Sequence, residues 1–555
     1  MSEQTLPPTP PESVVGREDF KVIAASSVGT VFEWFDFFLY GALAVVMSRN
    51  FFSGVDETTG FTLALLTFAA GLAVRPFGAL VFGFLGDLWG RKNTFVVTLS
   101  IMGLATFSVG LLPTYAQIGA AAPWILVVLR LIQGLSVGGV YGGAAVYVAE
   151  HSPQGRRGLY TSWIQLTATF AMALSLAVVF ATRTAVGENN FNEWGWRIPF
   201  LLSIFLLAIT LWIQFKLQES PVYLRMKASG KSSSRPWKDA FGNWKNLKLI
   251  LIALFGAIAG QAVIWYAAQF YVLFFLERVL KVEGSMANFL IASALLIHAP
   301  LYLLFGWLSD KIGRKPLILG ACLLAALTYF PIFKALTVAA NPDLAQAVAS
   351  APVVVAVDDA DCSFQFDPVG RATFSTSCDI ARSYLSRSGI PYETVSASAG
   401  SVAELRVGTQ ALVSFRGEEL SATDLEGQRS DWEAIAGTMI SSAGYPEKAD
   451  ASKINIPLVL LLLVILMSFS AMVYGPMAAL LTEYFPAKIR YTSMSFPYHI
   501  GVGWLGGFLP SAAFAIVAAT GNIYSGLWYP LLFALFSLVV GLIFLPETKN
   551  MDINQ

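Results

Sequence analysis

A ten-residue stretch occurs twice in this chain, and the repeat limits the possible folds more than any other feature. Residues 83–92 read GFLGDLWGRK and residues 306–315 read GWLSDKIGRK, and each copy joins two long apolar runs. The repeat predicts two related halves with a short charged hairpin at the same place in each. Paired halves of this kind are typical of membrane carriers that hold a solute near the middle of the bilayer.

The composition also indicates a membrane protein. Of the 555 residues, 55% are hydrophobic and 13% are charged, and the mean hydropathy is +0.62; a soluble domain carries roughly 25% charged residues. A spanning helix needs about 20 mostly apolar residues, and lipid favours helices because each backbone polar group must be satisfied within the span. We therefore expect an all-α membrane protein of two pseudo-symmetric six-helix bundles, with transmembrane helices near residues 21–48, 61–82, 93–112, 121–149, 158–182, 197–216, 248–276, 287–308, 316–338, 456–482, 491–518 and 525–545.

The distribution of Lys and Arg orients these spans. Loops after odd-numbered spans are poor in bases, whereas the middle loop is basic and the loops after even-numbered spans contain Arg91, Lys92, Arg156, Arg157, Lys311, Arg314, Lys315, Lys488 and Arg490. Both termini are thus expected in the cytoplasm. The predicted organisation is a tail (1–20), an N-terminal bundle (21–216), a cytoplasmic loop (217–247), helices 7–9 (248–340), an insert (341–455), helices 10–12 (456–546) and a tail (547–555).

The insert follows the ninth span, which places it outside the cytoplasm. It holds about 16 acidic and about 8 basic residues. Its pattern predicts a small α+β domain between helices 9 and 10, with strands at 353–357, 362–366, 372–375, 394–398 and 411–415 and helices at 379–388 and 431–443.

Two of the three cysteines, Cys362 and Cys378, lie in the insert. Outside the cytoplasm they can form a disulfide, and the alternative is two free thiols. Cys322 is expected to be a small buried hydrophobe. The acids Asp358, Asp359 and Asp361 favour a solvated face over a divalent-cation site.

Several function classes are disfavoured. No CxxC pair, phosphate-binding loop or nucleophile elbow is present, and three histidines leave little for a metal site or a catalytic triad. We therefore expect no enzyme activity, cofactor or metal. The bases are scattered without interleaved aromatic residues, so nucleic-acid binding is not expected.

Further stretches carry a family resemblance. They are EWFDFFLYG (33–41), RPFG (75–78), RLIQG (130–134), GG (138–139), WGWRIPF (194–200), ESP (219–221), YGPM (474–477), FP (485–486) and RYT (490–492). Together with the repeated hairpin, they resemble the metabolite:proton symporter branch of the major facilitator superfamily over nearly all of the chain except the insert. Val140 departs from that pattern, which usually has a glutamate there.

The resemblance implies a small organic solute carried with a proton, since the branch includes permeases for shikimate, 2-oxoglutarate, citrate and betaine or proline. Ionisable side chains within spans are costly and point to function. Glu33 and Asp36 share one helix face with Tyr40, so one carboxyl group is expected to carry a proton. The alternative is that both acids neutralise Arg75 or Arg130. Arg130 is assigned to coupling or to binding an anion, because guanidinium groups grip carboxylates.

The repeated hairpins are expected to be gating elements. Their aspartates can pair with a loop arginine or with a helix N-terminus, and their glycines allow close helix approach. The alternative is a loop that only sets topology. The gating candidates are Arg75, Gly83, Asp87, Gly90, Arg91, Lys92, Gly306, Asp310, Gly313, Arg314 and Lys315.

Polar side chains inside spans are expected to line the substrate cavity. The substrate-binding candidates are Tyr40, Arg130, Gln133, Gln165, Gln261, Trp265, Gln269 and Tyr474. His298 and His499 are read as interhelical histidines or, as the alternative, as proton relays.

The sequence therefore predicts a multi-pass protein of the cytoplasmic membrane that takes up a small organic acid together with a proton by alternating access. An exporter of the same fold, a betaine or proline symporter and a non-transporting sensor remain as alternatives. The expected partners are the substrate, the proton and the bilayer, with an unidentified external partner of the insert possible. We expect a monomer.

Overall fold

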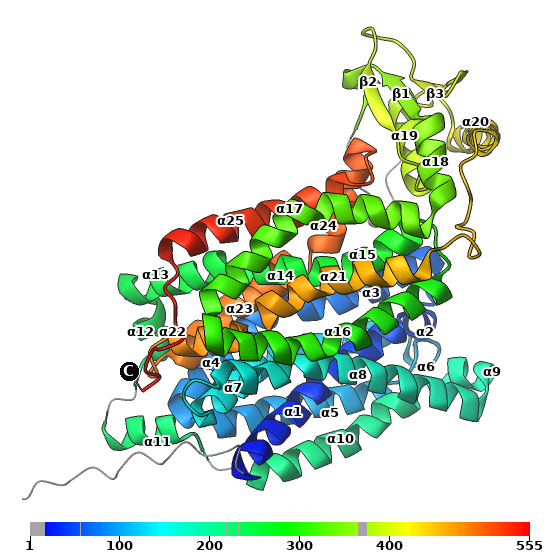
Figure 1. Ribbon diagram of the computed structural model, residues 1–555. Helices are drawn as coiled ribbons and strands as arrows, with labels where there is room; N and C mark the ends of the chain where they lie inside the picture. Colours follow the sequence, from blue (N-terminus) through cyan, green and yellow to red (C-terminus); the bar gives the residue numbers. More distant parts are fainter. Residues whose placement is uncertain (1–16, 56, 217–218, 231–232, 364–373, 555) are drawn as a thin grey trace, which may run out of the picture.

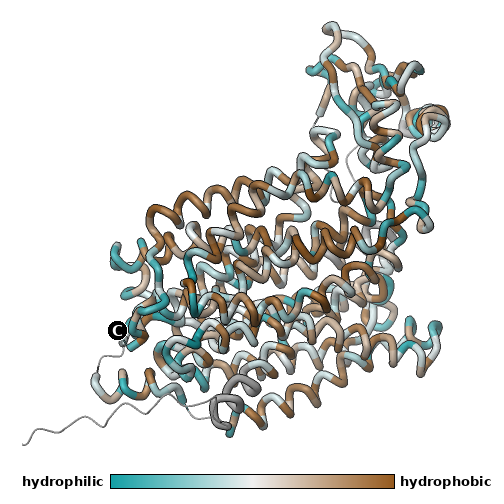
Figure 2. Tube along the Cα trace, viewed as in Figure 1, coloured by the Kyte–Doolittle hydropathy of each residue, from teal (hydrophilic) through white to brown (hydrophobic). Residues whose placement is uncertain are grey.

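A computed structural model describes residues 17–55, 57–216, 219–230, 233–363 and 374–554. Long helices run side by side through the molecule (Figure 1), and most of their residues are apolar (Figure 2). Within the described residues, eleven helices are long and apolar enough to cross a membrane, or twelve if the bent pair α1 (Arg17–Ala42) and α2 (Ala44–Phe51) is one span. The prediction of a helical protein with about twelve membrane spans is confirmed.

The first half of the chain supplies the first six spans. The bend between α1 and α2 is 63°. The second span begins in α3 (Glu57–Ala73) and continues in α4 (Arg75–Trp89). The remaining elements of this half are α5 (Arg91–Leu111), α6 (Tyr115–Ile118), α7 (Ala121–His151), α8 (Arg157–Val186), α9 (Glu188–Asn190), η1 (Phe191–Gly195) and α10 (Arg197–Lys216), with α11 (Pro221–Ala228) and α12 (Pro236–Phe241) in the middle loop.

The second half repeats the arrangement with more irregular helices. Its first span, residues 244–279, alternates α-helix and wider π-helical turns, which often occur near functional sites. Its elements are α13 (Trp244–Ala253), η2 (Leu254–Ile258), α14 (Ala259–Tyr266), η3 (Ala267–Tyr271), α15 (Val272–Phe274), η4 (Phe275–Val279), α16 (Gly284–Ile312), α17 (Arg314–Ala340), α21 (Ile456–Tyr474), α22 (Met477–Tyr484), α23 (Arg490–Ile500), η6 (Gly501–Gly506), α24 (Leu509–Thr520), η7 (Ser525–Leu527) and α25 (Trp528–Phe544).

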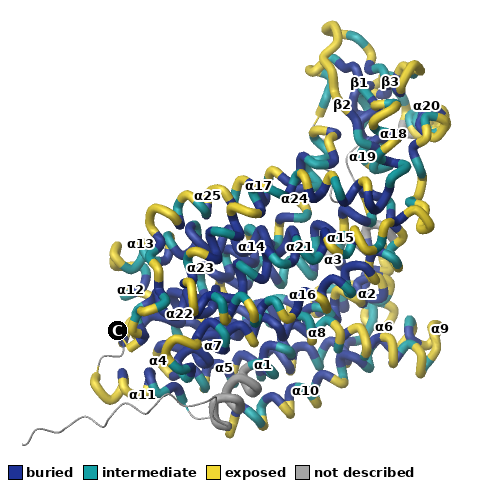
Figure 3. The backbone as a smooth tube through the Cα atoms, viewed as in Figure 1, coloured by how far each residue is buried: buried dark blue, intermediate teal, exposed yellow. Residues whose placement is uncertain are grey.

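The two halves meet mainly through two helix pairs, α4 with α23 and α8 with α16, and α7 also packs against α23. Buried residues follow the interior of the bundle, and exposed residues lie on its outer surface and ends (Figure 3). Small residues permit the close approach. A Cβ added to Gly83 would lie 2.8 Å from the Thr492 Cα, and one added to Gly306 would lie 2.5 Å from the Ser162 Cβ.

Both repeated hairpins turn at a glycine. Gly90 ends α4 with φ +110°, and Gly313 ends α16 with φ +108°. Residues with a Cβ rarely adopt this backbone region. Each glycine also touches a glutamate: an added Cβ would lie 2.2 Å from Glu219 Oε2 at the first hairpin and 2.4 Å from Glu547 Oε2 at the second. The two turns are therefore built in the same way.

Between α17 and α21 the chain forms a small sheet with helices. The elements are α18 (Pro342–Ser350), β1 (Val353–Val357), η5 (Asp359–Asp361), α19 (Ser377–Arg387), β2 (Glu393–Ser396), β3 (Glu404–Val407), β4 (Gln410–Val413) and α20 (Ala422–Ser442). The strand order is β2-β1-β3-β4. β1 pairs in parallel with β2 and antiparallel with β3, so Val355 lies between Thr394 and Leu405.

This unit, which we call the insert, projects from the end of the bundle opposite the C-terminus (Figure 1). The strands predicted at 353–357, 394–398 and 411–415 match or overlap β1, β2 and β4, and both predicted helices are present. α20 begins at Ala422, nine residues before its predicted start, because Ser421 caps it by accepting the Asp424 N–H.

Some predictions for the insert were wrong. Cys362, Ser363, Phe374 and Ser375 are not in strands, and the rest of the strands predicted at 362–366 and 372–375 lies outside the described residues. Cys362 and Cys378 form a disulfide, and their Cα atoms are 5.2 Å apart. The bridge joins the residue after η5 to the first turn of α19. β3 and α18 were not predicted.

Candidate functional site

The first hairpin holds the two halves together through Asp87. Its carboxylate accepts hydrogen bonds from the backbone N–H groups of Tyr491 (3.2 Å) and Thr492 (2.9 Å), in the first turn of α23. Arg91 lies 3.2 Å from the same carboxylate and donates to the Ala487 carbonyl in the opposite half (2.7 Å). Asp87 and Arg91 are fully buried. The hairpin therefore binds the positive end of a helix from the other half.

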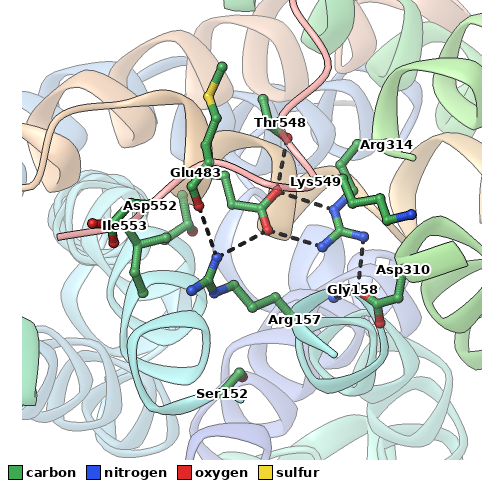
Figure 4. A network of polar contacts seen from close by, with 12 residues as sticks. Ser152, Arg157, Gly158, Asp310, Arg314, Glu483, Thr548, Lys549, Asp552 and Ile553 are labelled. Atoms are coloured by element: carbon green, nitrogen blue, oxygen red, sulfur yellow. Dashed lines mark hydrogen bonds and ion pairs between the residues drawn. The ribbon is translucent and has the colours of Figure 1, made fainter. Parts of the chain in front are cut away.

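The second hairpin makes the reciprocal contact through Asp310. Its carboxylate accepts the N–H groups of Gly158 (2.9 Å) and Leu159 (2.8 Å), in the first turn of α8. Arg314 lies 2.8 Å from Asp310 and 3.0 Å from Glu483 (Figure 4). Each half thus offers one aspartate to a helix of the other. We call each of these groups a clasp.

Further acids complete both clasps in equivalent places. Glu150 pairs with Arg490 of the opposite half (2.7 Å), and Glu483 pairs with Arg157 of the opposite half (3.5 Å; Figure 4). Each acid also accepts a hydrogen bond from a hydroxyl group: Ser220 donates to Glu150, and Thr548 donates to Glu483. Buried charges are tolerated here because each has several partners.

A third pair of acids binds backbone N–H groups of the two hairpin turns. Glu219 accepts the N–H groups of Arg91 and Lys92, and Glu547 accepts those of Arg314 and Lys315. The lysine side chains also correspond, since Lys92 donates to the Phe215 carbonyl and Lys315 to the Leu542 carbonyl. All the hairpin residues predicted to take part in gating lie in or beside these clasps, while Arg75 lies elsewhere.

The predicted coupling residues meet in the N-terminal half. Asp36 Oδ1 accepts hydrogen bonds from Thr106 (2.9 Å) and Gln133 (3.0 Å), and Asp36 Oδ2 lies 3.4 Å from the Arg130 Nη1. The Arg130 guanidinium also sits 3.9 Å from the centre of the Tyr40 ring. Asp36 is therefore held by an arginine, an amide and a hydroxyl in a buried position.

Glu33 is held less firmly than Asp36. It lines the same small cavity as Asp36, Arg75 and Arg130, with a volume of about 20 Å³, which is room for roughly one water. Glu33 Oε2, Arg75 Nε and two nitrogens of Arg130 are buried without a hydrogen-bond partner among the described residues. Buried polar groups without a partner indicate that a water or a ligand binds there, or that a proton is gained or lost. Arg75, whose guanidinium lies 5.4 Å from the Phe37 ring centre, belongs to this central cluster.

Aromatic rings from both halves lie beside the acids. Trp34 is 5.6 Å from Trp265 of the other half, and Tyr141 stacks on Tyr498 at 3.8 Å. The Tyr474 hydroxyl lies 2.6 Å from the Tyr498 hydroxyl. Phe37, which the Arg75 guanidinium covers, packs on Trp34 with 5.7 Å between ring centres. The acid cluster and this aromatic cluster are therefore contiguous.

The glutamines predicted to line the cavity differ in the hydrogen bonds that they make with this region. Gln165 donates to the Tyr141 hydroxyl (3.1 Å), and Gln269 donates to the Tyr302 hydroxyl (3.4 Å). The Gln261 Oε1 is buried without a partner in the described part of the chain. His298 bonds the Leu295 carbonyl within its own helix, and His499 lies near Arg75.

Sequence reasoning missed several members of both sites. Tyr141, Tyr302 and Tyr498 were not among the candidates, since a tyrosine within an apolar run gives no signal of its own. Glu150 was overlooked at the end of α7. A signal did exist for Glu219 and Glu547: each lies a few residues beyond the last helix of its half, so the repeat extends past the hairpins.

Comparisons with known proteins agree with this architecture. A model of the family described as sugar (and other) transporter matches residues 21–235 and 433–555. The chain belongs to that family. The matched residues cover both halves and leave out most of the insert.

Related proteins are transporters. The chain is 35% identical over 318 residues to a proline/betaine transporter of Salmonella typhimurium (55% of this chain, 63% of that one). It is 33% identical over 323 residues to a proline/betaine transporter of Escherichia coli K12 (56% and 64%). The matches thus span less than two thirds of these relatives. The relatives are not enzymes, as expected.

Solved structures share the fold. A proton:xylose symporter of the major facilitator superfamily, XylE, bound to 6-bromo-6-deoxy-D-glucose, has a TM-score of 0.60 at 16% identity, over 97% of this chain and 98% of that one. An inward-open form of XylE from E. coli gives a TM-score of 0.53 at 15% identity, over 96% and 98%. The resemblance to the major facilitator superfamily is confirmed.

Proposed function

We propose that this chain is a proton-coupled symporter of a small zwitterion of the betaine or proline type, working by alternating access. The observation that carries the proposal is the contact between the two central clusters. Glu33 and Arg75 line one cavity, and the Arg75 guanidinium lies over the Phe37 ring, which packs on Trp34 of the aromatic cluster. A solute with a carboxylate and an ammonium group complements that arrangement.

The proton acts through Glu33. Asp36 and Arg130 neutralise each other, so Glu33 is the acid that faces Arg75. When Glu33 is ionised, it competes with a substrate carboxylate for the Arg75 guanidinium. When Glu33 takes up a proton, Arg75 loses its partner and is free to bind that carboxylate. Proton and substrate therefore favour each other's binding, which is what symport requires.

The ammonium end fits the aromatic cluster. Trp34, Trp265, Tyr141, Tyr474 and Tyr498 present ring faces and hydroxyls within one region. A cation over such rings gains about 0.5–2 kcal/mol, and quaternary ammonium groups are recognised in this way. Two similar proteins are proline/betaine transporters, which supports the same solute class.

A small organic anion is the second candidate. The unpartnered nitrogens of Arg75 and Arg130 favour it, because a dicarboxylate can satisfy both. It makes no use of the aromatic cluster. The two candidates therefore differ in their dependence on ring residues.

The clasps explain how the halves alternate. With Asp87 and Asp310 each bound across the interface, the hairpin side of the protein is closed. Opening that side requires all four N–H groups to find new partners, so a bound substrate and proton must stabilise the open form. We place this side in the cytoplasm and the insert outside, in the cytoplasmic membrane, because basic loops gather at the hairpins.

Uptake into proteoliposomes tests the proposal. We expect an inward proton gradient to drive accumulation of radiolabelled glycine betaine or proline, and unlabelled 2-oxoglutarate or shikimate to compete weakly. Accumulation of the dicarboxylate instead supports the second candidate. No gradient-driven uptake of any of these solutes overturns proton symport.

A further inference from the structure

The insert and the bundle enclose a cavity that the transport cycle does not use. It has a volume of about 550 Å³, within the range of roughly 300–1,000 Å³ typical of small-molecule sites. We call it the seam cavity. Its wall is formed by the outer end of the seventh span (Phe274, Arg278), by α19 and the turn after it (Ser383, Arg387), and by the end of α24 (Phe514).

We propose that the seam cavity binds a small organic anion that has an apolar body. The lining contains two guanidinium groups, Arg278 and Arg387, and no carboxylate. Arg387 forms an ion pair with Glu433, which lies outside the lining, whereas the Arg278 side chain makes no hydrogen bond or ion pair among the residues that the structure describes. Ser386 and Ser511 add hydroxyls that can donate to an anion.

The rest of the lining is apolar and fits the body of such a ligand. Phe274, Phe514, Val517 and Ile523 lie on the bundle side, and Ile390 lies on the insert side. The first three lie within spans, as does Arg278 at the outer end of the seventh span, whereas Arg387 belongs to α19 of the insert. An amphipathic anion can therefore place its apolar body against the aromatic and aliphatic residues and its charge beside the two arginines.

The walls are fixed to each other by hydrogen bonds. The Tyr392 N–H donates to the Gly521 carbonyl (3.0 Å), and the Tyr392 hydroxyl donates to the Ala518 carbonyl (3.1 Å). Arg382 donates to the Ala519 carbonyl. A pre-formed cavity with fixed walls loses little free energy to ordering when a ligand binds.

The seam cavity is separate from the central site. Every lining residue comes from the insert or from the C-terminal half, so rocking of the halves does not dismantle it. The ligand is thus an accessory one that can stay bound through the cycle. This inference does not depend on the proposed solute or on proton coupling.

Calorimetric titration of octanoate into the full chain, held in nanodiscs of phosphatidylcholine, tests the proposal. We expect octanoate to bind, and octylammonium, which has the same body and the opposite charge, not to bind. Arg278→Gln should weaken octanoate binding about tenfold or more, because it removes a charged donor. Arg183→Gln, an equal charge change at an exposed arginine near Glu188, should change nothing.

Two further arms complete the test. In nanodiscs that contain phosphatidylglycerol, weaker octanoate binding identifies the lipid as the natural source of the anion, and unchanged binding identifies a soluble carboxylate. Arg130→Gln, in the central site, should leave the titration unchanged. If Arg278→Gln does not fold, Ser386→Trp, which fills the cavity without changing its charge, should abolish binding. Absence of binding to the wild type, or equal affinity in the wild type and the folded cavity variant, overturns the proposal.

Discussion

Asp87 and Asp310 occupy equivalent places in the two halves, and each carboxylate receives two backbone N–H groups from a helix of the opposite half. The groups around them correspond as well. Arg91 matches Arg314, and Glu150 matches Glu483. A duplicated sequence has therefore produced a reciprocal interface, in which each half closes on the other with the same chemistry.

This reciprocity predicts that either aspartate alone weakens closure. Asp87→Asn keeps one acceptor oxygen and loses the negative charge, so the hydrogen bonds from Tyr491 and Thr492 weaken. Hydrogen bonds to charged groups contribute about 1.5–3 kcal/mol each, and we expect the closed form to lose about 2 kcal/mol. Spin-label distances across the hairpins should lengthen in a larger share of molecules.

Asp310→Asn should give an effect of similar size, and the double variant a larger one. Asp343→Asn, at an exposed ion pair with Lys453 on the insert side, is the matched control and should leave the distances unchanged. An effect confined to Asp87 would contradict a symmetric closure.

The two central acids are predicted to differ. Glu33→Gln should abolish accumulation driven by a pH gradient while retaining exchange of labelled for unlabelled solute, because the neutral amide mimics the protonated form. Asp36→Asn should instead lower the thermal unfolding temperature, since it leaves the buried Arg130 without its carboxylate partner. Removing one partner of a buried ion pair costs about 3–5 kcal/mol.

Proteoliposome flux and thermal unfolding, measured on the same preparations, separate the two roles. The control is Gln133→Glu, which keeps the side-chain length beside Asp36 and should disturb stability by placing two acids together. If Glu33→Gln still accumulates solute against a gradient, Glu33 is not the proton carrier.

Trp265 should determine affinity for an ammonium solute. Trp265→Leu removes a ring that contacts Trp34 and Tyr474, so the KM for glycine betaine should rise by about 2–30-fold, equivalent to about 0.5–2 kcal/mol. Trp265→Phe keeps a ring and should have a smaller effect. Equal KM values for the Leu and Phe variants would exclude a contribution of the ring face.

The sequence predicted the helices because length and hydropathy alone define a span. It predicted the hairpins as gates because Asp and Gly-Arg-Lys occur in both halves. It did not predict which of the two acids would be bound by neighbouring side chains, since Glu33 and Asp36 lie on one helix face. That difference comes from Thr106 and Gln133, which other helices bring to Asp36.

The aromatic cluster could not be predicted from the sequence, for a related reason. Tyr141 and Tyr498 are 357 positions apart, and only the packing of α7 against α23 stacks their rings. The irregular seventh span was also unforeseen, because hydropathy does not distinguish α-helical from π-helical turns. In the insert, the sequence indicated the Cys362–Cys378 pairing and three of the strands, but not β3 or α18.

The hairpin glycines give the last prediction. Gly90→Ala and Gly313→Ala each put a Cβ into positive-φ backbone, which costs about 1–2 kcal/mol, and against a glutamate oxygen. Each variant should lower the thermal unfolding temperature. Gly320→Ala is the matched control, since an added Cβ meets nothing within 4 Å in the helix α17. It should be neutral or stabilising by up to about 1 kcal/mol, because alanine favours helix. If Gly313→Ala is as stable as Gly320→Ala, the turn does not need its glycine, and the equivalence of the two hairpins fails at that residue.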